Sequence, residues 1–145
     1  MSRHSNAIAP SIIKEVRCRL RANYMPNHFG FRLVEAQTGR VVLRMDVRKR
    51  HKQNHGVAHG GVLAALVDTA GGIATSLSYP LGTRVATIEL KVNYLEAVPG
   101  GFVEAAAKVV RKGRHIAVVD CDVRDQDKRL VVKALMSFFV GPFPK

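Results

Sequence analysis

The chain has 145 residues, a length that fits one domain with its own hydrophobic core, so we expect residues 1–145 to form a single domain. Its formal net charge is +12, but the basic residues are scattered and no nucleic-acid-binding signature accompanies them, so the charge suits a phosphorylated small molecule better than nucleic acid. No apolar run approaches the roughly 18 residues of a membrane span and the N-terminus lacks a secretory signal, so we expect a cytoplasmic protein without membrane contact.

The N-terminal part predicts one helix followed by a pair of strands. Residues 11–22, SIIKEVRCRLRA, place four apolar side chains at helical spacing after Ser11, a suitable N-cap, and predict a short amphipathic helix. Residues 24–30, YMPNHFG, have the composition of a loop. The following residues, 31–47, alternate as two strands joined by a turn at Thr38-Gly39.

The middle of the chain predicts one long apolar helix that carries a single carboxylate. The segment from His59 to about Leu77 is rich in Ala, Leu and Val and lacks Pro, which favours a helix of about 19 residues. Asp68 is its only acidic or basic side chain after His59. Burying an ionised carboxylate costs several kcal/mol unless it is paired or hydrogen-bonded, so a function is one candidate reason for Asp68. The adjacent glycines 71 and 72 would each cost the helix about 1 kcal/mol relative to Ala, which predicts a tightly packed neighbour.

The last third of the chain predicts strands. Four runs alternate apolar and polar residues: VATIELKVNYL, GFVEAAAKVVRK, HIAVVDCDVRD and RLVVKALMSFFV. Short turn segments separate these runs, and the pattern predicts an antiparallel meander. Two strands, one long helix and four strands predict an α+β fold, in which one strongly curved antiparallel sheet wraps around a central helix.

Three segments carry a resemblance to a known family: GVAHGGVLAALVDTAGG at residues 56–72, ATIELKVNYLEAVPGG at 86–101, and KVVRKGRHIAVVDCDVRDQDKRLVVKA at 108–134. They resemble the hotdog-fold acyl-CoA thioesterases, and within them the phenylacetate-pathway (PaaI-type) branch. The most specific part is His-Gly-Gly followed by Asp68, and the resemblance covers about residues 30–140. It implies the hotdog fold and hydrolysis of acyl-CoA to the free acid and coenzyme A. It also implies no cofactor other than the coenzyme A of the substrate.

The resemblance also implies roles for particular residues. The backbone amide of Gly60 polarises the thioester carbonyl, and Asp68 acts as general base on water or as nucleophile. Thr87, on the strand after the helix, helps to place the water or the carboxylate. The branch commonly has Asn six residues before the His, whereas this chain has Gln53 there and Asn54 one position later. An amide side chain at either position can hydrogen-bond to the substrate.

The chemistry of a helix start agrees with these roles. A helix N-terminus has free amides and a partial positive charge, which suits a developing oxyanion. Glycine at positions 60 and 61 lets a substrate carbonyl approach the backbone closely, so we also expect Gly61 to contact the substrate. His59 either orients this loop by hydrogen bonding or acts as the catalytic base.

Three basic residues surround a predicted turn between two of the last strands. Arg111, Lys112 and Arg114 flank Gly113. They either are solvated turn residues or hold the phosphates of coenzyme A, which guanidinium and ammonium groups bind well.

The spacing of the candidate site residues predicts a dimer. Gly60 and Asp68 lie about 12 Å apart along one helix and about 80° apart around it. A reacting carbonyl and its attacking water must lie within about 3.5 Å of each other. We therefore predict an obligate homodimer with antiparallel helices and two composite sites, and the resemblance adds pairing of such dimers into a tetramer. One chain supplies Gln53, His59 and Gly60, and the other supplies Asp68 and Thr87.

Other interpretations stay open from the sequence. Asp68 is also compatible with a structural carboxylate, and Thr87 with a polar strand face. His51, His55 and His59 recur every four residues, but the loop composition around them and the lack of Cys or acidic ligands predict no metal site. Three other functions are a hotdog enoyl-CoA hydratase or dehydratase, an acyl-CoA-binding protein without turnover, and a nucleic-acid-binding module.

Overall fold

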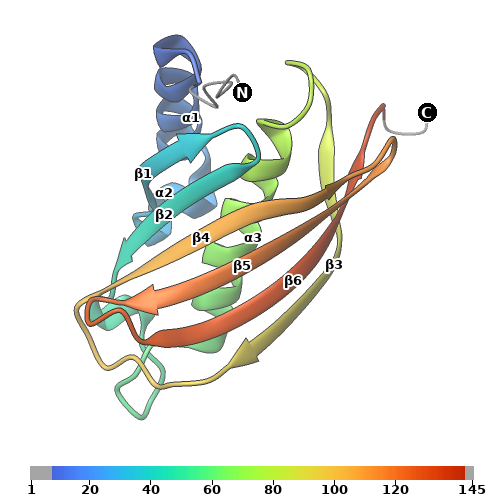
Figure 1. Ribbon diagram of the computed structural model, residues 1–145. Coiled ribbons are helices and arrows are strands. Elements are labelled where there is room, and N and C mark those ends of the chain that lie inside the picture. Colours follow the sequence, from blue (N-terminus) through green and yellow to red (C-terminus); the bar gives the residue numbers. More distant parts are fainter. Residues whose placement is uncertain (1–7, 143–145) are drawn as a thin grey trace, which may run out of the picture.

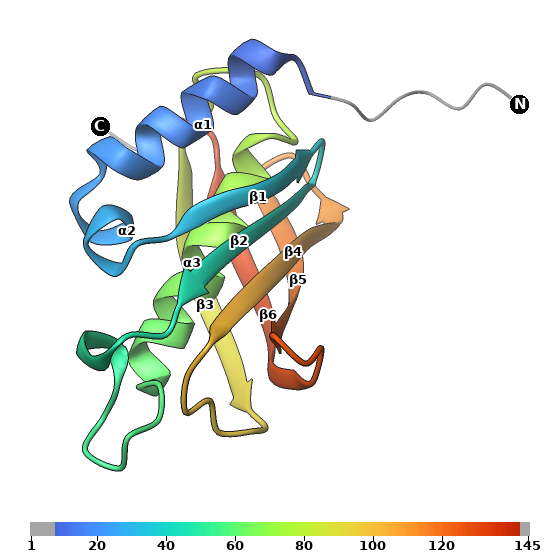
Figure 2. The same cartoon turned by 90° about the vertical axis from the view of Figure 1, so that its left-hand side faces the viewer.

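The structure, a computed structural model, describes residues 8–142. A six-stranded antiparallel sheet wraps around the long helix α3 (Gly60–Ser76), while the helices α1 (Pro10–Ala22) and α2 (Tyr24–Phe29) lie beside β1 at one end of the sheet (Figures 1 and 2). The predicted α+β arrangement of a curved sheet around a central helix is confirmed.

The order of the strands differs in one respect from the predicted meander. The strands are β1 (Arg32–Gln37), β2 (Arg40–Asp46), β3 (Val85–Tyr94), β4 (Phe102–Lys112), β5 (Ile116–Asp125) and β6 (Leu130–Val140), in the order β1-β2-β4-β5-β6-β3. Only β4, β5 and β6 form a meander, because α3 carries the chain from β2 across the concave face to the far edge, where β3 pairs with β6. The prediction that β3 is the first strand of the meander is therefore wrong, and β4 pairs with β2 instead.

The expected loop at residues 24–30 is wrong, because Tyr24–Phe29 form α2. Pro26 lies in the first turn of this helix, where a missing backbone N–H removes no helical hydrogen bond. Gly30 ends the helix with φ +71°, in the left-handed region that glycine adopts without strain. The residues that indicate a loop thus stand at positions where a short helix also accepts them.

The core lies between the concave face of the sheet and α3. Leu66, Val67 and Ala70 of α3 are fully buried against inward-facing residues of the strands. Gly71 brings the helix close to β6, because a Cβ there would lie 2.7 Å from the Cε of Met136. This contact accounts for one of the two glycines inside the helix.

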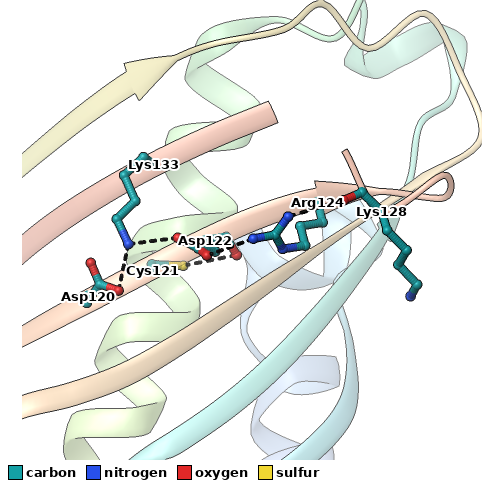
Figure 3. A network of polar contacts seen from close by, with 6 residues as sticks. All are labelled: Asp120, Cys121, Asp122, Arg124, Lys128 and Lys133. Carbon is teal, nitrogen blue, oxygen red and sulfur yellow. Dashed lines mark hydrogen bonds and ion pairs between the residues drawn. The ribbon is translucent and has the colours of Figure 1, made fainter. Parts of the chain in front are cut away.

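Charged residues on the outer face of the sheet are paired with each other. Lys133 of β6 donates hydrogen bonds to Asp120 at 2.7 Å and to Asp122 at 2.8 Å, both on β5 (Figure 3). These bonds raise the pKa of Lys133. Because Asp122 and Lys133 are direct partners across the two strands, the network supports the register of β5 against β6.

Candidate functional site

Asp68 and Thr87 are hydrogen-bonded within one chain. The Oγ1 of Thr87 donates to the Oδ1 of Asp68 over 2.7 Å. Asp68 is only half-buried, because the sheet covers one side of α3 and Asp68 lies on the other. The single chain thus leaves Asp68 partly accessible, and within residues 8–142 its Oδ2 has no hydrogen-bond partner.

A β-bulge lies next to Thr87 on β3. The register against β6 shifts between Thr87 and Glu89, so that Ile88 is an extra residue in β3. A bulge bends its strand locally and re-aims the neighbouring side chains, and bulges are common beside active sites. Thr87 is thereby directed at α3, a geometry that strict alternation along the strand does not predict.

The start of α3 leaves one backbone amide open. His59 is the N-cap, and its Nδ1 accepts a hydrogen bond from the Gly61 amide over 2.9 Å. The amides of Val62 and Leu63 donate to the carbonyl oxygen of His59 at 3.0 and 3.3 Å. Within residues 8–142, the Gly60 amide has no such acceptor. It is the free donor that an oxyanion needs, and His59 uses its Nδ1 to orient the turn that presents it.

Tyr94, at the end of β3, fixes the position of Gly60. Its hydroxyl donates to the Gly60 carbonyl oxygen over 2.8 Å. Its ring lies so close that a Cβ at residue 60 would be 3.1 Å from the ring carbon Cζ. Sequence reasoning misses Tyr94, and its only signal is its place in the run NYLEAVPGG, which belongs to one of the segments that carry the family resemblance.

The loop before α3 holds Gln53 and Asn54. The side-chain Oε1 of Gln53 accepts a hydrogen bond from the backbone amide of His55 over 2.6 Å. The backbone amide of Gln53 donates to the Val57 carbonyl oxygen. Asn54 is exposed. The Gln53 side chain thus closes a local turn through its oxygen, and its NH₂ group is the part that remains for a ligand.

Buried His51 connects this loop to the preceding strand. The His59 amide donates to the His51 carbonyl over 2.8 Å. Burial lowers the pKa of His51, and the neighbouring Arg50 lowers it further.

Within residues 8–142, no group of three His, Cys, Asp or Glu side chains is arranged to hold a metal ion.

The basic hairpin lies far from Gly60 along the helix. Arg111 and Lys112 end β4, and Arg114 follows in the turn before β5. Tyr79, just after α3, donates to the Gly113 carbonyl over 2.7 Å, and the Lys112 Nζ lies 5.0 Å from the Tyr79 ring centroid. The hairpin therefore lies by the C-terminal end of α3, opposite its start at Gly60 (Figure 1).

A cleft of about 390 Å³ opens between α1 and the second half of α3. Gly72, one helical turn after Asp68, is part of its wall. Much of the lining is apolar, and it includes Ile12, Val16, Leu20, Ile73, Leu77 and Leu81. A partly apolar cleft thus begins one helical turn from the candidate carboxylate, a combination typical of a ligand site.

The single chain brings some candidate residues together and keeps others apart. Asp68 contacts Thr87, and the Gly60 turn is held by His59 and Tyr94. The two groups stand two helical turns apart on α3. Within the described part of the chain, β3 has β6 as its only neighbouring strand, so its other edge is open.

No helix in this part is long and apolar enough to cross a membrane.

Comparison with known proteins gives a consistent result. The Thioesterase superfamily matches residues 55–132. The chain is 26% identical over 102 residues to the 1,4-dihydroxy-2-naphthoyl-CoA hydrolase of Listeria monocytogenes, covering 70% of this chain and 83% of the relative. Thioesterase HI1161 of Haemophilus influenzae superposes with a TM-score of 0.82 at 28% identity, covering 92% of this chain and 91% of that chain.

A second solved structure bears on the fold. The PaaI protein of the Escherichia coli phenylacetic acid degradation operon superposes with a TM-score of 0.83 at 19% identity, covering 92% of this chain and 95% of that one. The hotdog fold implied by the sequence resemblance, including the likeness to PaaI, is confirmed.

Proposed function

We infer the function from family membership: the chain belongs to the Thioesterase superfamily and is a thioester hydrolase. We propose that its substrates are acyl- or aryl-acyl-coenzyme A thioesters, which it cleaves to the free acid and coenzyme A. The observation that carries this proposal is the hydrogen bond from Thr87 to Asp68 on the open side of α3. The Listeria relative acts on an aryl-CoA, which supports the choice of coenzyme A as the carrier.

The proposed reaction uses Asp68 as the base. Thr87 occupies one carboxylate oxygen and fixes its orientation, so the other oxygen takes a proton from water. The resulting hydroxide adds to the thioester carbonyl, and the oxyanion accepts the hydrogen bond of the Gly60 amide. The C–S bond then breaks, and the leaving thiolate takes the proton from Asp68, which releases coenzyme A as the thiol and restores the carboxylate. Direct attack by Asp68 is the variant of this path that passes through an anhydride.

We propose that two chains complete each site. The open amide at Gly60 and the carboxylate of Asp68 are too far apart on one helix to act on the same carbonyl. An antiparallel partner helix would place its Gly60 beside this chain's Asp68, at the side of α3 that the sheet leaves uncovered. The open edge of β3 offers the backbone groups for pairing with the same strand of a second copy. Two such dimers would make the tetramer.

The same arrangement would bring the substrate's two ends to suitable surroundings. The acyl group would enter the apolar cleft between α1 and α3, which begins one turn from Asp68. Arg111, Lys112 and Arg114 would then face the partner's half of the site, because their hairpin lies at the end of α3 opposite Gly60. Together with Asn54 and Gly61 at the helix start, they are the proposed coenzyme A contacts, whereas Gln53 belongs with the proposed catalytic groups.

The first experiment measures free thiol release from phenylacetyl-, benzoyl-, hexanoyl- and palmitoyl-CoA. We expect turnover of at least one of them and a loss of about 10²–10⁴-fold in Asp68→Asn, the usual contribution of a general base. Thr87→Ser should retain most activity because it keeps the hydroxyl, whereas Thr87→Val should lose it. Full activity in a folded Asp68→Asn variant would disprove the mechanism. Binding of acyl-CoA without any thiol release would favour a binding protein.

A second experiment isolates the Gly60 amide. Gly60 is the first residue of α3, where Pro is tolerated, and His59 already has an extended conformation suited to a residue before Pro. Gly60→Pro removes the N–H, whereas the control Gly60→Ala adds a Cβ against Tyr94 but keeps the N–H. We expect Gly60→Pro to lower kcat about 10²–10³-fold more than Gly60→Ala, the usual effect of one oxyanion donor. Equal kcat in the two variants would remove the amide from the mechanism.

The composite arrangement predicts complementation. When Asp68→Asn and Gly60→Pro chains are refolded together, a mixed dimer contains one site with both functional groups intact. Random pairing should then restore about a quarter of the wild-type rate. No restored activity, with mixed dimers present by native mass spectrometry, would contradict sites shared between two chains.

A further inference from the structure

A second cleft lies on the other side of α1, away from the candidate catalytic residues. Its volume is about 520 Å³, and it runs between α1 and α2 on one side and β1 and the end of β2 on the other. Figure 2 shows these four elements side by side. Its wall contains five arginines and a single carboxylate, Asp46, and we name it the arginine cleft. The arginines are Arg17, Arg21, Arg32, Arg48 and Arg50.

These arginines come from three separate parts of the chain. Arg17 and Arg21 stand one turn apart on α1, Arg32 begins β1, and two more follow β2. A solvated helix face explains charges that spread along one element, but it does not explain convergence from three elements on one hollow. The convergence therefore marks a concave surface with a concentrated positive field.

The α1 pair is unfavourable for the helix itself. Like charges four residues apart destabilise a helix by about 0.2–0.5 kcal/mol. Within residues 8–142, Arg17 and Arg21 have no ion-pair partner, whereas Arg19, on the side of the other cleft, is bound to Glu15. The side of α1 that faces the arginine cleft thus keeps two uncompensated guanidinium groups.

The other arginines are only partly neutralised. Asp46 binds Arg32 at 2.8 Å and lies 3.9 Å from Arg48, so one carboxylate serves two guanidinium groups. The Nδ1 of His51 lies 3.1 Å from the backbone amide nitrogen of Arg48, and its Nε2 lies 3.2 Å from the Nε of Arg50. A neutral imidazole accepts a hydrogen bond at only one of its two nitrogens. Arg50 therefore competes with a backbone amide for His51 and is available to another acceptor.

We propose that the arginine cleft binds a phosphate-bearing organic anion of nucleotide size. Guanidinium groups bind phosphate oxygens in pairs, and several of them around one hollow match a ligand with more than one phosphate charge. The ring of Phe29 adds an apolar wall beside them. The cleft volume falls in the range of small-molecule sites, which favours a mononucleotide over a polymer.

Two sources offer this chemistry. One is the phosphoadenosine end of the coenzyme A substrate, and this source alone depends on the proposed function. The other is a free nucleotide that binds independently of the thioester. The arginine cleft adjoins the loop before α3, since buried His51 contacts Arg50 and accepts the His59 amide hydrogen bond at its carbonyl. A ligand bound to Arg50 would thus be linked through His51 to the segment that presents Gly60.

The test begins with direct binding, which needs no turnover. Isothermal titration calorimetry with adenosine 3′,5′-bisphosphate and with ATP compares wild type, a cleft variant and a matched control. The cleft variant carries Arg17→Gln and Arg21→Gln. The control carries Lys14→Gln and Lys108→Gln, which remove the same charge from exposed positions outside the cleft. We expect at least about a tenfold weaker Kd in the cleft variant, since charge-assisted hydrogen bonds of this kind each contribute that much.

Kinetics then identifies the source. If the substrate's own nucleotide occupies the cleft, the cleft variant raises KM for benzoyl-CoA but not for benzoyl-pantetheine, and adenosine 3′,5′-bisphosphate competes with benzoyl-CoA. If a separate nucleotide binds, KM is unchanged and the nucleotide binds without competition. Equal Kd values in the cleft and control variants would overturn the proposal. So would a wild type that binds generic oligonucleotides but neither mononucleotide.

Discussion

The adjacent glycines of α3 provide a paired test of how the helix packs. A Cβ at Gly71 would lie 2.7 Å from the Cε and 2.8 Å from the Sδ of Met136, and 3.0 Å from the Cε2 of Phe138. A Cβ at Gly72 would have its nearest neighbour, the Cε1 of Phe138, at 3.7 Å, an ordinary contact. The same substitution at neighbouring positions should therefore change stability in different directions.

The difference between the two variants isolates the steric cost. Replacing a helical glycine by alanine favours the helix by about 0.8–1 kcal/mol at either position. At Gly72 this gain stands alone, so Gly72→Ala should stabilise the fold by about that amount. At Gly71 it is opposed by overpacking of about 1–3 kcal/mol, because Met136 and the ring of Phe138 must both shift. Gly71→Ala should therefore be less stable than Gly72→Ala by about 1–3 kcal/mol.

Urea unfolding followed by circular dichroism measures both free energies, and thermal melts should differ by about 2–4 °C for each kcal/mol. A Gly71→Ala variant as stable as Gly72→Ala would refute the close approach of α3 to β6. If Gly72→Ala is destabilised instead, with a loss that depends on protein concentration, a second chain packs on Gly72.

Three further predictions concern single side chains. Cys18 is exposed and Cys121 is buried, and burial raises the pKa of the Cys121 thiol to about 12, so a thiol reagent should label Cys18 in the native protein and Cys121 only after unfolding. The lowered pKa of buried His51 means that the unfolded chain binds a proton that the folded chain does not, so stability should fall as the pH drops below about 6.5, and His51→Gln should reduce this dependence. Tyr94→Phe should cost about 0.5–1.5 kcal/mol in urea unfolding and also lower kcat, whereas Tyr79→Phe, which loses a similar hydrogen bond elsewhere, should change stability without changing kcat.

Local patterns predicted most elements but not how all of them pair. The alternation of apolar residues identified the strands, and the long apolar run identified α3 to within one residue at each end. The placement of β3 beside β6 was missed because it depends on the path of α3 across the sheet, which is a long-range packing effect. Residues 24–30 were assigned to a loop because Pro26 and Gly30 favour turns, although both also fit the ends of a short helix.

The residues of the candidate site likewise fall into those that the sequence predicts and those that only the folded chain reveals. The roles of Asp68, Gly60 and Thr87 are expectations from the family resemblance, which is carried by a contiguous motif and by the strand that follows it. Tyr94 was missed because its contact joins the end of β3 to the start of α3, two places that no local pattern connects. The arginine cleft was missed for the same reason, since its residues belong to three segments that only the folded chain brings together.

The incomplete features of the single chain share one explanation. The Gly60 amide has no acceptor within the described residues, one side of α3 around Asp68 is uncovered by the sheet, and β3 ends the sheet with an open edge. An open edge strand invites pairing with another chain, and the helix start and the carboxylate each supply only one of the two groups that thioester hydrolysis needs. A second chain, related by a twofold axis next to β3, would cover the open edge and enclose Asp68. It would also bring a bound thioester, whose oxyanion the Gly60 amide would stabilise. The features that leave the single chain incomplete are therefore those that the proposed dimer would complete.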